Sequence, residues 1–187
     1  MRKRSIWALA ALGLGALIGA AAYFGLTPSA PVTAAVHPVW TEVKWPFPID
    51  QWGTGKAFHC NASDCGTEAD VYLRPKIGFC NCTTGVADDQ ELERVADLDL
   101  FGDRRLALAA GRPIAVRWMK GRSRPYSFSG FLTKGTSTLT IAFNDRCDVI
   151  VATVVAGDNR PAALESVALE FLNGDTVIRW AEAALGL

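Results

Sequence analysis

Two closely spaced pairs of cysteines, Cys60 with Cys65 and Cys80 with Cys82, most constrain how this chain of 187 residues can fold. Cysteines clustered in this way form disulfides when a protein folds in an oxidising compartment. A bridge between Cys80 and Cys82 would be strained, because residues two apart in a strand stand near the limit of disulfide geometry. We therefore expect two disulfides that join one couple to the other, each stabilising the fold by about 3 kcal/mol. Either cross-pairing fits, and Cys147 is expected to be a buried free thiol, unless it pairs and leaves one of the other four unpaired.

A metal site is the second interpretation of the same thiols. Four thiolates from Cys60, Cys65, Cys80 and Cys82, with His59 as a further donor, would satisfy zinc or copper. Paired zinc ligands are usually separated by two to four residues, and the couple of Cys80 and Cys82 does not follow this rule. A redox role is also disfavoured, because the sequence contains no CxxC motif. We therefore expect disulfides and no cofactor.

The first 26 residues predict a transmembrane anchor or a signal sequence. Arg2, Lys3 and Arg4 precede a run from residue 6 to residue 26 that contains no charged residue. A spanning helix needs about 20 apolar residues and a secretory signal only about 7 to 15, so the length favours an anchor in a bacterial inner membrane. Because the basic residues stay on the cytosolic side, the rest of the chain is expected to face the periplasm. If the leader is cleaved, the product is a soluble periplasmic protein.

Residues 27–39 and 40–187 have different compositions. The first range is rich in Pro, Ala and Thr and predicts an extended spacer, whereas the second predicts one folded domain. The domain begins with residues 40–52, which contain three tryptophans and two prolines. Proline excludes a helix there and large aromatic side chains usually become buried, so we expect an extended strap that lies on the domain.

Apolar periodicity in residues 40–187 predicts an α+β fold. A helix is expected to begin at Asp88 or Asp89, and two more are expected after Pro161 and after Asp175, in preference to a closing hairpin. Strands are expected at 56–60 and at 69–79, the latter broken by Pro75, followed by an antiparallel meander at 113–119, 126–132, 138–143 and 147–155. The predicted domain is an antiparallel sheet of about four to six strands with helices packed on one face.

Few residues suit catalysis. The chain has two histidines, and because His37 lies in the spacer, histidine chemistry in the domain would depend on His59 alone. The sequence contains no serine-hydrolase, zinc-protease or phosphate-loop motif. A hydrolase that uses carboxylates distant in sequence remains the third hypothesis for the function.

The charge distribution suggests a binding surface. Basic and acidic residues number 19 each, and this neutrality argues against a general nucleic-acid binder. Residues 104–144 nevertheless carry eight basic residues and no acidic ones. Their densest part is predicted to be a turn, so Lys120, Arg122 and Arg124 are expected to contact an acidic protein or anionic lipid. The alternative is that this basic half faces the acidic residues of the segment 88–103 in the same molecule.

These features together favour a membrane-tethered, periplasm-facing domain that binds or assembles with another envelope component without catalysis. The inner membrane is the expected contact of residues 6–26. A thiol-based protein that handles copper or zinc is the alternative, and the hydrolase comes third.

Overall fold

The computed structural model describes residues 38–102, 104–129, 137–157 and 161–187. The predicted anchor or signal at residues 1–26, and nearly all of the predicted spacer at 27–39, lie outside the described residues. Among those that are described, no helix is long and apolar enough to cross a membrane.

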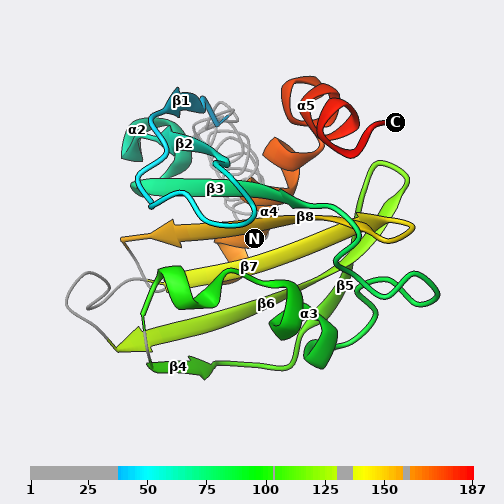
Figure 1. The fold of residues 1–187 in the computed structure, drawn as a ribbon. Coiled ribbons are helices and arrows are strands. Elements are labelled where there is room, and N and C mark those ends of the chain that lie inside the picture. Colours follow the sequence, from blue (N-terminus) through cyan, green and yellow to red (C-terminus); the bar gives the residue numbers. More distant parts are fainter. Residues whose placement is uncertain (1–37, 103, 130–136, 158–160) are drawn as a thin grey trace, which may run out of the picture. The chain divides into compact units, whose positions relative to one another are not determined.

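One antiparallel sheet of eight strands forms the centre of the fold (Figure 1). Its strands are β1 (Thr41–Val43), β2 (Lys56–Cys60), β3 (Ala69–Lys76), β4 (Arg104–Ala107), β5 (Arg112–Val116), β6 (Met119–Ser129), β7 (Ser137–Asp145) and β8 (Asp148–Ala156). Their order is β1-β2-β3-β8-β7-β6-β4, and β5 also pairs with β6. The predicted antiparallel α+β class is confirmed, but the predicted four to six strands are too few. The edge strands β1 and β4 have only three and four residues, too few for an alternating pattern to show.

Helices cover both faces of the sheet, so the prediction of helices on one face is wrong. The helices α4 (Pro161–Leu172) and α5 (Asp175–Leu185) share a core with Ile150, Ala152 and Val154 of β8. The helix α3 (Asp89–Val95) packs instead against the alternate residues Val149 and Val151 (Figure 1). A strand buried on both faces reads as a continuous apolar run, which is what β8 shows.

The predicted helices are otherwise confirmed. Asp88 caps α3, because its carboxylate accepts a hydrogen bond of 2.8 Å from the backbone N–H of Glu91. The carboxyl-terminal segment forms α4 and α5 and no hairpin. The described residues also form two short helices, α2 (Ala62–Cys65) and the 3₁₀ helix η1 (Leu98–Leu100).

Several strand boundaries differ from the prediction: β3 and β5 end earlier than expected, and β6 begins earlier. Pro75 does not break β3, because the pairing of β2 with β3 ends at Leu73 and leaves Pro75 with a neighbour on one side only. Residues 120–125 are not a turn but lie within β6, which begins at a hairpin turn formed by Arg117 and Trp118. Gly121 permits this course, since a Cβ atom there would lie 2.0 Å from the Ala142 carbonyl oxygen.

Two disulfides are present, as predicted, but their pairing is different. Cys60 bonds to Cys65 across α2, and Cys82 bonds to Cys147 at the turn between β7 and β8. Cys80 is the free, buried cysteine. The expected cross-pairing and the expected free Cys147 are therefore wrong, whereas the alternative, that Cys147 pairs and leaves one of the other four cysteines unpaired, is confirmed.

The position of β3 explains why cross-pairing is impossible. Cys60 pairs with Ala69, the first residue of β3. Cys80 lies beyond the other end of that strand, four residues after its last residue, Lys76. A strand of eight residues separates its ends by about 25 Å, far beyond the reach of a disulfide. Disulfides fit an oxidising extracellular or periplasmic environment.

Candidate functional site

A cleft of about 540 Å³ lies where β3 begins and β8 ends. It lies on the face of the sheet that carries α3, since Tyr72 and Val155 belong to that face. Its lining comprises Pro46, Phe47, Glu68, Asp70, Tyr72, Leu100, Phe101, Val155, Ala156 and Gly157. This volume lies within the range of ligand-binding clefts in proteins.

Three aromatic rings form the wall of the cleft. Phe47 lies edge-on to Tyr72 at 5.0 Å and to Phe101 at 5.1 Å between ring centroids, and Tyr72 lies 5.5 Å from Phe101. Each ring comes from a different element: the extended strap, β3, and the residue that follows η1. Edge-to-face contacts hold the rings in place, so the wall is preformed.

Two carboxylates stand at the mouth of the cleft, and His59 joins them. The Nδ1 atom of His59 lies 2.9 Å from Asp70 Oδ1, and its Nε2 atom lies 3.3 Å from Glu68 Oε2. The side chains of Glu68 and Asp70 are 63% and 39% exposed, so both can meet a ligand from solvent. Burial raises the pKa of Tyr72 to about 12, which keeps its hydroxyl neutral. The mouth of the cleft is therefore acidic.

His59 is expected to titrate above the ordinary histidine pKa of 6.5, because its hydrogen bond to Asp70 favours the imidazolium ion. The stability that this charge contributes is complete below the unfolded-state pKa and is lost as the pH rises through the higher folded-state pKa. An NMR titration of the His59 ring checks the direction. Asp70→Asn should lower the midpoint, and a midpoint at or below 6.5 in the unaltered chain would contradict this assignment.

A buried ionic cluster lies beside the cleft on the same face of β3. Arg74 and Lys76 are only 1% and 3% exposed. Asp97 accepts hydrogen bonds of 3.0 and 2.7 Å from Arg74 and lies 2.9 Å from Lys76 Nζ. Burial lowers the pKa of Lys76, but its ammonium group also donates to the Val95 carbonyl oxygen.

The ionic cluster also holds the strap, residues 40–52, against the sheet. Asp50 accepts a hydrogen bond of 2.7 Å from Arg74, and the Arg74 guanidinium lies 5.6 Å from the centroid of the Trp45 ring. Asp97 is the residue immediately before η1. The cluster therefore positions both segments that supply aromatic rings to the cleft.

The predicted basic surface has partners within the chain. Arg122 pairs with Asp89, and Arg124 lies 2.6 Å from Glu93, both carboxylates belonging to α3. Lys120 is exposed. The alternative from the sequence, that the basic half faces the acidic segment 88–103, accounts for both arginines. Both arginines lie within β6, so the predicted turn at these residues is wrong.

The predicted metal ligands do not gather at one place. Cys60, Cys65 and Cys82 are bonded in disulfides, and burial raises the pKa of the Cys80 thiol to about 11. His59 belongs to the acidic mouth described above. Within the described ranges, no group of three or more His, Cys, Asp or Glu side chains could hold a metal ion.

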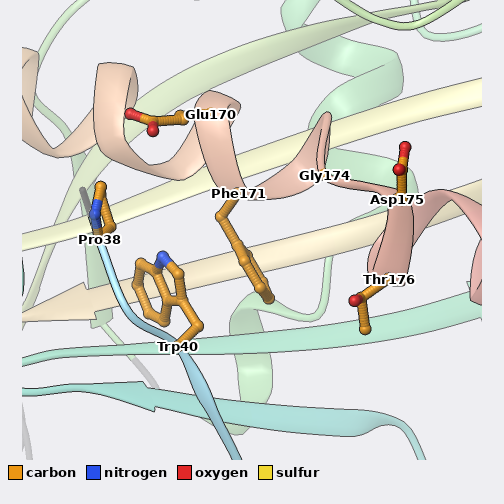
Figure 2. Close-up of a pocket in the computed structure, with 7 residues that line it drawn as sticks. All are labelled: Pro38, Trp40, Glu170, Phe171, Gly174, Asp175 and Thr176. Atoms are coloured by element: carbon orange, nitrogen blue, oxygen red, sulfur yellow. The ribbon is translucent and has the colours of Figure 1, made fainter.

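Two smaller cavities are weaker candidates. Figure 2 shows one of about 250 Å³, where Pro38 and Trp40 meet the corner between α4 and α5. Trp40 lies 4.8 Å from Phe171, and its buried indole N–H has no acceptor among the described residues. The other, of about 410 Å³, contains Glu165, which already accepts hydrogen bonds from Ser123 and Arg112. The first cavity also has carboxylates, but it has less than half the volume of the cleft, and its Asp175 already pairs with Arg117. The second cavity is lined by no aromatic ring among the described residues.

The spacing of three residues in the sequence could have indicated part of the cleft. Glu68, Asp70 and Tyr72 are two residues apart, the spacing that places side chains on one face of a strand. Phe47 and Phe101 come from distant segments, and only the folded chain brings them to Tyr72. Comparison of the chain with protein-family models, with curated proteins and with solved structures found no match.

Proposed function

We propose that this protein is a non-catalytic docking module of the bacterial envelope that binds a partner in the aromatic cleft. The observation that carries the proposal is the preformed wall of Phe47, Tyr72 and Phe101 next to two exposed carboxylates. Such a combination of apolar surface with a few polar groups is typical of binding sites. A site facing the periplasm, on a chain tethered to the inner membrane, would meet other envelope components.

The chemistry of the cleft supports binding in preference to catalysis. Both ring nitrogens of His59 face carboxylates, so neither is directed at a substrate in the cleft. Among the described residues that line the cleft, none is a serine, threonine or cysteine that could act as a nucleophile. The hydrolase hypothesis therefore gains no support from this site.

Photocrosslinking in living cells tests the proposal. A photoreactive p-benzoylphenylalanine in place of Leu100, which lines the cleft, should crosslink a partner several-fold more strongly than the same group in place of Trp118. Trp118 is a suitable control because it is 51% exposed and lies at the hairpin turn between β5 and β6. Equal crosslinking from both positions, or none from position 100, would refute the proposal.

A variant that fills the cleft provides a second test of the docking site. Gly157 lines the cleft, and a Cβ atom added there would meet no atom within 4 Å. Gly157→Phe should therefore leave the thermal unfolding midpoint nearly unchanged while it abolishes the crosslink from position 100. A crosslink that persists in the filled cleft would place the partner elsewhere.

A further inference from the structure

The described part of the chain uses one arrangement three times: an arginine lies over an aromatic ring and pairs with a carboxylate. The guanidinium carbons lie 4.8 to 5.6 Å from the ring centroids, and the nitrogens lie 2.6 or 2.7 Å from the carboxylate oxygens. The three sets are Arg74 with Trp45 and Asp97, Arg94 with Phe79 and Glu91, and Arg124 with Tyr126 and Glu93. A guanidinium group suits both neighbours, because it is planar and presents a fork of N–H donors.

The cleft contains the aromatic rings and the carboxylates of this arrangement but not the arginine. Its wall supplies aromatic rings and its mouth supplies carboxylates, but no arginine or lysine is among the described residues that line it. Glu68 and Asp70 each use one oxygen for His59, and the other oxygen of each has no hydrogen-bond partner in the described part of the chain. Two acceptors next to an aromatic wall are therefore available to a cation.

We propose that the cleft receives an arginine side chain of a partner protein, an inference that rests on the proposed docking function. The guanidinium would stack on the wall of Phe47, Tyr72 and Phe101 and donate hydrogen bonds to the free oxygens of Glu68 and Asp70. Arginine fits better than lysine, because a planar guanidinium bonds carboxylates in pairs and stacks on rings, whereas an ammonium is a strongly hydrated point charge.

The acidic mouth also selects against the partners that the sequence first suggested. An acidic protein or an anionic lipid would be repelled by Glu68 and Asp70, and the basic side chains of Arg122 and Arg124 are already paired with α3. The partner chemistry is thus basic, opposite to the sequence-based expectation.

Two matched peptides test the inference on the full-length chain with its disulfides oxidised. One is the blocked tripeptide Ala-Arg-Ala, and the other replaces arginine by citrulline, which has nearly the same shape but no charge. NMR titration should show shifts at Tyr72, Phe101 and Val155 with the arginine peptide, and binding should be about tenfold or more weaker with citrulline. Asp70→Asn combined with Glu68→Gln should reduce the arginine affinity to that of citrulline.

Glu42→Gln supplies the control, because it removes a carboxylate of the same sheet that pairs with Lys56 and lies outside the cleft. It should leave the arginine affinity unchanged. Equal affinity of the two peptides at the cleft would overturn the arginine inference but leave the docking function standing. Failure of both peptides to shift the cleft resonances, while crosslinking from position 100 persists, would also overturn it. Loss of that crosslink would instead remove the docking function itself.

Discussion

Replacement of Asp97 by asparagine is expected to lower the free energy of unfolding by about 3–5 kcal/mol. Asp97 has a side chain only 10% exposed and is the carboxylate shared by Arg74 and Lys76, whose side chains are 2% and 4% exposed. Asparagine has nearly the same shape but removes the carboxylate from two buried cations. Among the described residues, Arg74 then keeps an ion pair with Asp50, and Lys76 keeps none. Urea denaturation of the oxidised protein measures the change.

Asp99→Asn is the matched control. Asp99 lies two residues further along, and its side chain is 92% exposed in an ion pair with Arg105. A surface pair of this kind contributes at most about 1 kcal/mol. Similar losses for the two variants would show that burial of the cluster does not determine its importance. A loss below about 1 kcal/mol for Asp97→Asn would mean that water reaches Arg74 and Lys76.

The second large effect concerns the disulfide between Cys82 and Cys147. The bond closes a loop of 65 residues, and the chain-entropy relation gives a contribution of about 4 kcal/mol for a loop of that length. The double variant Cys82→Ser, Cys147→Ser should lose about this much stability in urea denaturation. Both cysteines must be changed, because the backbone N–H of Cys80 bonds to the carbonyl oxygen of Cys147 and places a second thiol nearby.

The other disulfide provides the comparison. Cys60 and Cys65 are five residues apart, and so short a loop gives only about 2 kcal/mol. Cys60→Ser, Cys65→Ser should therefore be the milder double variant. If the order of the two losses were reversed, loop length would not be the source of the stabilisation. Peptide mapping of the unaltered chain without reductant should recover both bridges and free Cys80.

Local patterns were sufficient to predict much of the fold. Apolar periodicity predicted α3, α4 and α5, and apolar segments separated by turn-forming residues between 113 and 155 predicted the meander of β5 to β8. Those elements depend on side chains close in sequence. The error at residues 120–125 arose because Gly121 and Pro125 are typical of turns, whereas Gly121 serves the close approach of β7.

The disulfide pairing could not be predicted from the spacing of the cysteines, because it depends on the topology of the sheet. β3 carries the chain away from Cys60, and the turn between β7 and β8 returns Cys147 to the segment of Cys80 and Cys82. This return depends on the pairing of β3 with β8, two strands that have residues 77–147, about half of the domain, between them. The alternating spacing of Cys80 and Cys82 indicated only that they would not bond to each other.

The candidate site, like the disulfide pairing, depends on contacts between segments that are distant in sequence. In the sequence, His59 is a single histidine beside a cysteine, and no local pattern links it to Glu68 or Asp70. The register of β2 against β3 sets it opposite Asp70, and the strap and η1 bring the remaining rings. Arg74 and Lys76 appear in the sequence as polar positions of a strand. They are buried because the strap and the segment of Val95 and Asp97 cover them.

A crystal structure of the chain with the blocked Ala-Arg-Ala tripeptide tests the central claim most directly. The guanidinium should lie within about 6 Å of the centroid of Tyr72 or Phe101 and about 2.7–2.9 Å from a carboxylate oxygen of Glu68 or Asp70. A peptide bound at another surface, with the cleft left to solvent at saturating concentration, would contradict the assignment of this cleft as the docking site for arginine.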